Sequence, residues 1–362
     1  MKYSRRGILL AIVLVICLII KIYSSSEARV ENGYANGFFP LFGKGMRYLF
    51  GSIPFSVGDL IYTFVIGFLA WKLARFFRFV YRKPKRSAYL QRFKKLGYSI
   101  LLTPGIIYIV FNLFWGINYN RKGIAWQLGL PGQKYTTAEL REMNCLLLEK
   151  VNSSKRTLVK QPIVYPTNKQ LFEKVELAYQ KLTAEYPFLS YQPSSIKTSM
   201  WGWFGNYAGF TGYYNPLTGE AQLNTTIPKF LQPFTACHEV AHQVGYAKEM
   251  EANFVGYLAA KASPDTLLHY SVYLDLFMYA NRNLFINDSL SARIYAKELD
   301  SAVKKDILEW RKFNLQHQGK LEPLVRWAYG KYLQSNQQPN GISSYDEVTG
   351  FLIAYYKKFK KI

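Results

Sequence analysis

The sequence predicts a membrane-anchored α+β protein, in which three N-terminal transmembrane helices precede a mainly helical domain with a small β-sheet. Three observations support this fold class. The first third of the 362-residue chain holds long apolar runs, the remainder shows helical periodicity, and one Gly- and Tyr-rich stretch interrupts that periodicity with turn signals. Because 49% of the residues are hydrophobic, the chain can bury a sizeable core and is not disordered.

Three apolar runs are predicted to span the membrane, at about residues 7–23, 57–73 and 96–115. The first run is short enough for a signal peptide, but no convincing small-residue cleavage site follows it and two more runs do. We therefore expect residues 1–118 to form a membrane domain, with Asp59 in the interfacial zone.

The positive charge of the chain is concentrated beside these runs. The net charge is +23, and residues 1–118 contribute +14 of it from 17 Lys and Arg and 3 acids. Residues 75–95 hold nine bases and no acid, and such a loop stays in the cytoplasm. The nearly neutral, Gly- and Phe-rich loop 24–55 should then lie outside. Since flanking spans explain the basic run, no nucleic-acid partner is expected.

This orientation puts the N-terminus in the cytoplasm and residues 119–362 outside the cytoplasmic (inner) membrane. Capping boxes, Thr136 with Glu139 and Thr167 with Gln170, predict helices through about residues 151 and 186. A short β-sheet that ends in a hairpin is expected over residues 196–224. Helical periodicity then predicts helices at about residues 233–245, 247–262, 265–284, 289–313, 320–335 and 344–358.

The motif that carries chemistry is His-Glu-Val-Ala-His at residues 238–242. Histidines at positions i and i+4 lie on one helical face, so His238 and His242 can bind one Zn²⁺ ion. Glu239 can reach a water in the open coordination position and act as the general base. The remaining faces of this helix are small and apolar, so it should be buried, and buried imidazoles and a carboxylate are costly without a metal or paired partners.

A catalytic zinc needs a third protein ligand, and the next helix offers two carboxylates. Gly245 can end the first helix with a left-handed turn, so that the second begins near Ala247. Glu249 is preferred as the ligand because it shares a small face with Asn253, which could hydrogen-bond a ligand histidine from the second coordination shell. Glu251 is the alternative third ligand.

These residues resemble two groups of known proteins. The motif is similar to that of gluzincin metallopeptidases, in which a second helix supplies a glutamate ligand, and residues 249–253 are similar to the E-x-x-A-D signature of the CAAX-protease and HtpX type, with Asn253 in place of Asp. The whole chain also resembles the bacterial family catalogued as domain of unknown function 3810, through residues 214–220 and 238–254. The resemblance implies a zincin-like domain.

Other residues near the motif have less specific signals. Tyr213 and Tyr214, in the predicted hairpin, are candidates for substrate binding, because a strand near the zinc helix can pair with an extended peptide. A donor to the transition state could also come from Tyr257, His269 or Tyr270. The cluster at residues 201–204 could line a substrate groove, but buried sheet packing is preferred.

We therefore expect a membrane-anchored zinc metallohydrolase, most simply a peptidase that uses one Zn²⁺ and acts on a peptide or protein of the cell envelope. Two alternatives stay open. The protein could be a non-catalytic zinc-binding envelope protein, or a metal-dependent hydrolase of the cell wall.

Overall fold

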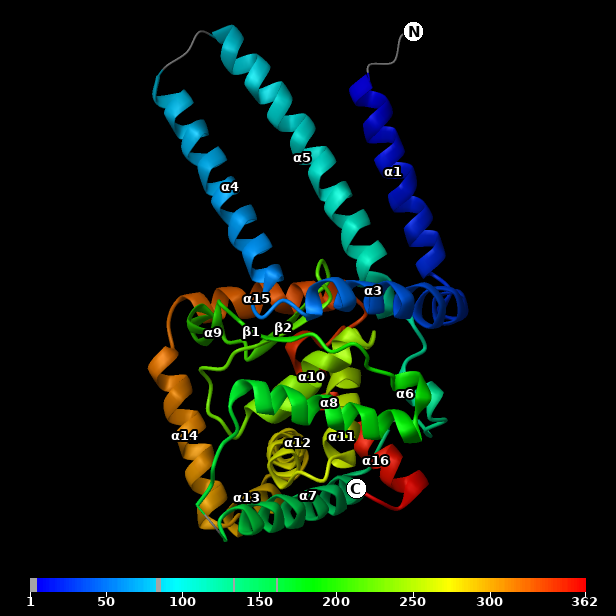
Figure 1. Ribbon diagram of the computed structural model, residues 1–362, viewed down its shortest axis with the longest axis vertical. Helices are drawn as coiled ribbons and strands as arrows, with labels where there is room; N and C mark the ends of the chain where they lie inside the picture. Colours follow the sequence, from blue (N-terminus) through cyan, green and yellow to red (C-terminus); the bar gives the residue numbers. More distant parts are fainter. Residues whose placement is uncertain (1–4, 83–85, 133, 161) are drawn as a thin grey trace.

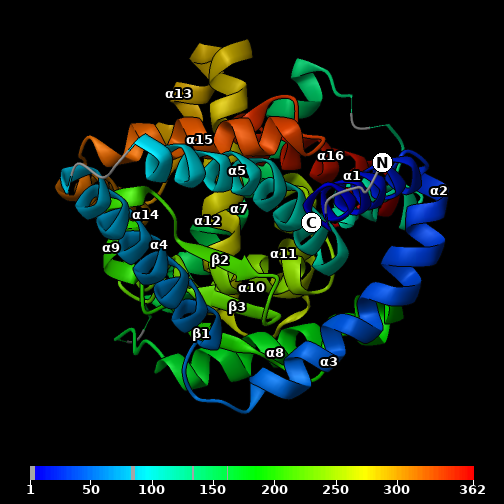
Figure 2. The ribbon, with the colours of Figure 1, turned by 90° about the horizontal axis from the view of Figure 1, so that it is seen from above.

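The computed structural model describes residues 5–82, 86–132, 134–160 and 162–362. Three long helices, α1, α4 and α5, rise from one side of a mainly helical domain that contains one small sheet (Figure 1). Figure 2 shows from above that α4 reaches the domain on one side of its centre, where α10 and α11 lie, and that α1 and α5 reach it on another side. The helical content and the small sheet agree with the predicted class.

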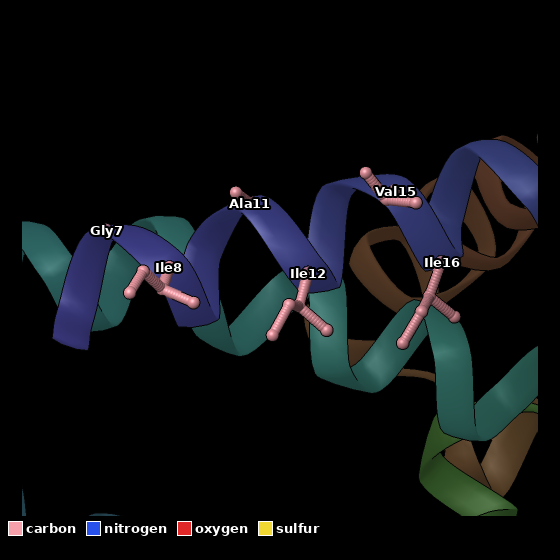
Figure 3. A pocket seen from close by; sticks show the side chains of 6 residues that line it. All are labelled: Gly7, Ile8, Ala11, Ile12, Val15 and Ile16. Carbon is pink, nitrogen blue, oxygen red and sulfur yellow. The ribbon is translucent and has the colours of Figure 1, made fainter. Parts of the chain in front are cut away.

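The three long helices are α1 (Arg5–Ser24), α4 (Val57–Tyr81) and α5 (Arg86–Phe114), and each is long and apolar enough to cross a membrane. α1 packs along α5, where Gly105 leaves no room for a side chain beside Val13. An apolar groove of about 420 Å³ runs along α1, as Figure 3 shows, and is lined by Gly7, Ile8, Ala11, Ile12, Val15 and Ile16. The apolar window of α4 has no buried residue.

The basic segment between the last two spans is mostly helical. α4 continues to Tyr81 and α5 begins at Arg86, so most of the nine bases of residues 75–95 extend the two helices. Lys83 and Lys85 lie outside the described residues.

The segment between the first two spans is also helical, which corrects the expectation of a loop over residues 24–55. It forms α2 (Glu27–Arg29), the π-helix η1 (Val30–Phe38) and α3 (Phe39–Gly51). Phe39, Gly43 and Arg47, at i and i+4 spacing, turn one face of α3 towards the domain. Arg47 donates hydrogen bonds to the Pro193 and Gln243 carbonyls, which fixes α3 to the domain.

Helices make up most of the domain that follows. Both predicted capping boxes are present, at Thr136 and Thr167. The helices and 3₁₀ segments outside the centre are η2 (Gly116–Asn120), α6 (Ile124–Gln127), α7 (Thr137–Leu158), α8 (Asn168–Glu185), η3 (Pro187–Leu189), α12 (Thr266–Asn287), α13 (Ser289–Glu298), α14 (Ser301–His317), α15 (Leu321–Ser335), η4 (Gly341–Glu347) and α16 (Val348–Phe359).

One predicted helix, over residues 289–313, is divided into α13 and α14. The chain is extended at Leu299 and Asp300 between them. Leu299 is buried, and the Asp300 N–H donates to Asn152 of α7. These tertiary contacts replace the helical bonds that periodicity alone predicts.

The sheet has three strands in the order β1-β3-β2. β3 (Glu220–Leu223) pairs in parallel with β1 (Ile196–Thr198) and antiparallel with β2 (Gly212–Asn215), which forms the predicted hairpin. Between β1 and β2 the chain forms α9 (Gly202–Ala208), ended by Gly209 in a left-handed conformation. The expected sheet is therefore present, but a helix that was not expected interrupts it. Trp203 is 70% exposed, so the expected sheet packing of the 201–204 cluster is wrong.

Two helices form the centre of the domain, α10 (Gln232–Gln243) and α11 (Glu249–Ala262). Every residue of α10 is buried. The two helices approach closely at Gly256, where an added Cβ would lie 3.1 Å from the His238 backbone nitrogen. Their contact brings the HExxH motif against the second helix.

Candidate metal centre

The motif histidines lie on α10, one helical turn apart, and the turn after α10 sets the position of α11. Gly245 has a φ of +96°, and the N–H groups of Gly245 and Tyr246 donate to the carbonyls of His242 and Ala241. This Schellman arrangement ends the helix as Gly245 predicts. α11 then begins at Glu249, and the Glu249 N–H donates to Gln338 at 2.9 Å.

Three side chains converge beneath the first turn of α11. The Nε2 atoms of His238 and His242 are 3.1 Å apart, and they lie 3.2 and 3.5 Å from Oε2 of Glu249. All three residues are buried, and their ligand atoms lie within 4.8 Å of one another. Such a cluster of two imidazoles and one carboxylate could hold a metal ion.

The second ring nitrogen of His242 orients this ligand. Its Nδ1 lies 2.7 Å from the Tyr246 carbonyl oxygen, which can only accept, so Nδ1 carries a proton and Nε2 faces the cluster. The Trp115 indole N–H donates to the His242 carbonyl at 3.2 Å. The ring of Tyr345 stacks on His238, with centroids 6.1 Å apart and planes at 17°. Both imidazoles are therefore held before any ion binds.

The other oxygen of Glu249, Oε1, accepts a hydrogen bond of 2.6 Å from the Tyr329 hydroxyl. The Tyr329 side chain is 36% exposed, but the burial of its hydroxyl end and the Glu249 carboxylate raise its pKa well above the usual value, so the phenol stays a donor. Burial would also raise the pKa of Glu249, but His242 and His238 lower it overall. The carboxylate is therefore ionised, and the same interaction raises the pKa of His242 although burial opposes the rise.

Glu239 lies next to this cluster and is also buried. Burial raises its pKa to about 7, although the neighbouring His238 and His242 oppose the rise. Its Oε1 atom faces β2, where an added Cβ on Gly212 would lie 2.6 Å away. Its Oε2 atom has no hydrogen-bond partner among the described residues. A carboxylate with a free oxygen and a pKa near neutrality can take up a proton.

The two remaining predicted residues of α11 have other positions. The Glu251 carboxylate lies against Gly123 and accepts from the Ile124 backbone, outside the histidine cluster. Asn253 was expected to hydrogen-bond a ligand histidine, but its amide donates to the Tyr345 carbonyl at 3.3 Å. Asn253 therefore holds the residue that stacks on His238, and Glu249 alone of the two glutamates faces the histidines.

The tyrosines and the histidine expected as substrate contacts or donors have other partners. Tyr213 donates to Asp59, and Tyr214 packs on Trp115. His269 lies 2.7 Å from the Ser263 carbonyl, and Tyr270 donates to Asp306 at 2.5 Å. Tyr257 is fully buried in the core.

The aromatic hydroxyls that do surround the cluster are those of Tyr329 and Tyr345. Sequence reasoning missed both, because they follow the motif by about a hundred residues and no local pattern distinguishes them from the other tyrosines. Only the packing of α15 against η4 and of η4 against α11 brings them to Glu249 and His238.

Comparison with known proteins gave one family match. Searches of curated proteins and of solved structures returned no match. The family model described as "Protein of unknown function (DUF3810)" matches residues 34–353, which include α3, α4, α5, the sheet and the whole histidine cluster. The chain therefore belongs to the DUF3810 family.

Proposed function

We propose that this protein is a membrane-anchored zinc metallopeptidase whose catalytic domain lies outside the cytoplasmic membrane. One observation carries the proposal: His238, His242 and Glu249 converge in a buried site, and Glu239 lies beside them with a free oxygen. The arrangement resembles that of a gluzincin, with two motif histidines and a glutamate from the next helix.

The separations between the donor atoms are close to those around a tetrahedral zinc ion. A tetrahedral ion with bonds of about 2.0–2.2 Å holds its ligand atoms about 3.3–3.6 Å apart. The observed separations are 3.1, 3.2 and 3.5 Å, so one lies in this range and two are 0.1–0.2 Å shorter. Glu249 Oε2 has no hydrogen-bond partner among the described residues, and a cation would supply one. When bound, the ion would polarise a substrate carbonyl and lower the pKa of a water.

Glu239 would be the general base. Its pKa of about 7, raised by burial, suits a group that takes a proton from water and then gives it to the leaving amine at neutral pH. The free Oε2 atom leaves the carboxylate available to that water. Tyr329 would hold Glu249 in place through its hydrogen bond.

β2 would position the substrate. It pairs with β3 alone among the strands of the described chain, so its other edge is available to an extended peptide. Gly212, at the start of β2, lies against Glu239. A peptide bound along this edge would therefore pass the general base.

The proposed orientation in the membrane follows from the basic segment 75–95. We place this segment in the cytoplasm of a bacterium, with the catalytic domain outside its inner membrane.

The experiment uses the full chain in lipid nanodiscs, freed of metal by chelation and then given one equivalent of Zn²⁺. Bound zinc is measured by mass spectrometry, and hydrolysis is measured with a library of quenched fluorescent peptides. Wild-type protein should bind one zinc and cleave peptides. Glu239→Gln should keep the zinc and lose activity by about 10²–10⁴-fold, because the proton acceptor is gone.

His238→Ala should lose both zinc and activity. Glu251→Gln is the matched control, because it changes a buried glutamate of the same helix that lies outside the cluster, and it should keep both. Full activity in Glu239→Gln would rule out the mechanism. Absence of zinc binding in the wild type would rule out the metal centre.

A further inference from the structure

The end of the third span lies against the metal cluster. The 19 residues from Leu96 to Phe114 extend about 28 Å at 1.5 Å per residue, close to the hydrocarbon thickness of a bilayer of about 30 Å. With Lys94 and Lys95 at one boundary, Phe114 lies at the other. The next residue, Trp115, donates to the His242 carbonyl, and its ring centroid lies 5.7 Å from that of His242.

The start of the second span is tied to the strand beside the general base. Asp59, in the first turn of α4, is buried and accepts hydrogen bonds from the Tyr213 hydroxyl and, at 2.7 Å, from the Met200 N–H. Glu220 of β3 accepts from the N–H groups of Val57 and Gly58. The start of α4, where this span meets the domain, is thus joined to both strands of the hairpin.

A third element of the same layer, α15, has one side at the cluster and the other side free. Its inner side carries Tyr329, which donates to Glu249. Its outer side carries Leu324 and Trp327, which are 61% and 64% exposed. Figure 1 shows α15 in the layer of the domain next to the spans. An exposed leucine and tryptophan at this level are typical of residues that enter a membrane interface.

From these contacts we infer that the metal site lies at the bilayer surface and that its substrate is a membrane-anchored polypeptide, cut where it emerges from the bilayer. The inference rests on the proposed function for the reaction, but its structural part does not. The outer leaflet of the protein's own membrane covers the outer side of α15. Two spans then flank the site. Trp115, which follows α5, contacts His242, and Asp59 of α4 bonds to β2.

A substrate held in the same membrane has an advantage at such a site. Its scissile segment is confined to the layer in which the site lies, which raises its local concentration over that of a soluble peptide. A bond far from the bilayer would reach the site only by bending back towards it. The distance between the bond and the membrane should therefore determine the rate.

The first experiment measures the depth of α15 without using activity. A nitroxide spin label is attached to Leu324→Cys in nanodiscs, in a chain that also carries Cys17→Ala and Cys145→Ser, and its collisions with oxygen and with a nickel chelate are compared by electron paramagnetic resonance. Cys237 is retained because it is fully buried. Leu290→Cys is the matched control, since Leu290 is 70% exposed on α13 at the far end of the domain (Figure 1).

The label at residue 324 should show a several-fold higher ratio of oxygen to nickel collisions than the label at residue 290. Equal ratios would overturn the inference that α15 contacts the bilayer, whatever the activity of the protein.

The second experiment compares one cleavable peptide in three forms: soluble, joined to a transmembrane anchor by about five polar residues, and joined by about forty. The value of kcat/KM should be at least ten-fold higher for the short tether than for the long tether or the soluble form. Equal values would overturn the substrate class while leaving the peptidase intact. If the peptide library yields no cleavable peptide, the proposed function is overturned, and the depth measurement still decides the position of the site.

Discussion

Two buried polar clusters lie on either side of Gly245, and they differ in how their hydrogen-bonding groups are used. Around Glu31 the carboxylate is saturated. It accepts from Arg121 at 3.0 Å, from the Lys122 N–H at 3.0 Å and from Gln127 at 3.1 Å. Around Glu249, in contrast, Oε2 of the carboxylate faces two imidazole nitrogens at 3.2 and 3.5 Å. The two clusters lie at similar depth, but the carboxylate of the first is paired with a guanidinium and that of the second with titratable imidazoles.

This difference separates a structural cluster from a binding site. Arg121 also donates to the Gly245 carbonyl, so the Glu31 cluster joins η1 to the turn that precedes α11. Its charge is neutralised within the protein. The histidine cluster leaves Glu239 Oε2, Glu249 Oε2 and His238 Nδ1 without hydrogen-bond partners among the described residues. Unpartnered groups that converge in this way are consistent with the metal ion proposed above.

The largest change in stability is expected when the saturated cluster around Glu31 is broken. Arg121→Met should lower the free energy of unfolding by about 3–5 kcal/mol, because Glu31 would remain as an uncompensated buried charge. Thermal unfolding in nanodiscs, followed by circular dichroism, measures the loss.

The matched control is the double variant Arg121→Met with Glu31→Gln, which removes both charges and should regain most of the stability. An equally large loss in the double variant would contradict the charge argument and assign the effect to packing around Tyr246.

The next largest change in stability is expected when a zinc ion binds the cluster around Glu249. Zn²⁺ at about 100 times its dissociation constant should stabilise the metal-free protein by about 2.7 kcal/mol, since the ion binds the folded state. His238→Ala should lose this increment, whereas Arg121→Met should keep it despite its lower starting stability. An equal increment in His238→Ala, measured by the same unfolding experiment, would show that the ion binds elsewhere.

The contrast between the clusters also explains how far the sequence could predict them. The HExxH spacing lies within one helix, so His238, Glu239 and His242 could be found from local pattern, as could the spans and the two capping boxes. The choice between Glu249 and Glu251 depends on the Schellman turn at Gly245 and the approach of α10 to α11 at Gly256. Those features set which side of α11 meets the histidines.

Other parts depend on contacts between distant segments. The loop expected over residues 24–55 is helical because Arg47 bonds to carbonyls more than a hundred residues away. α9 interrupts the expected sheet because the Asn224 amide binds the Gly202 carbonyl across the turn. No period in the local sequence carries this information. The partner of Glu31, Arg121, is likewise ninety residues distant.

A smaller effect tests the fit between the two ligand helices. Gly256→Ala should separate α10 from α11 by a few tenths of an ångström, since the new Cβ would lie 3.1 and 3.2 Å from backbone atoms of His238. We expect a loss of about 1–3 kcal/mol from overpacking and weaker zinc binding, measured by competition with a chelating dye. Gly45→Ala, on α3 with open space around it, is the control and should change neither. Unchanged zinc affinity in Gly256→Ala would mean that the cluster tolerates a wider helix separation.

The smallest effect tests the contact between the site and the third span. Trp115→Phe keeps an aromatic ring against His242 but removes the indole N–H that donates to its carbonyl. The loss should be about 0.5–1.5 kcal/mol, the usual contribution of one hydrogen bond, because the same carbonyl still accepts from Gly245. Zinc affinity should fall by less than in Gly256→Ala, since Tyr246 continues to orient the imidazole through Nδ1. If the free energy of zinc binding instead falls by more than the free energy of unfolding, the hydrogen bond from Trp115 positions His242. The end of the third span would then contribute directly to the metal site.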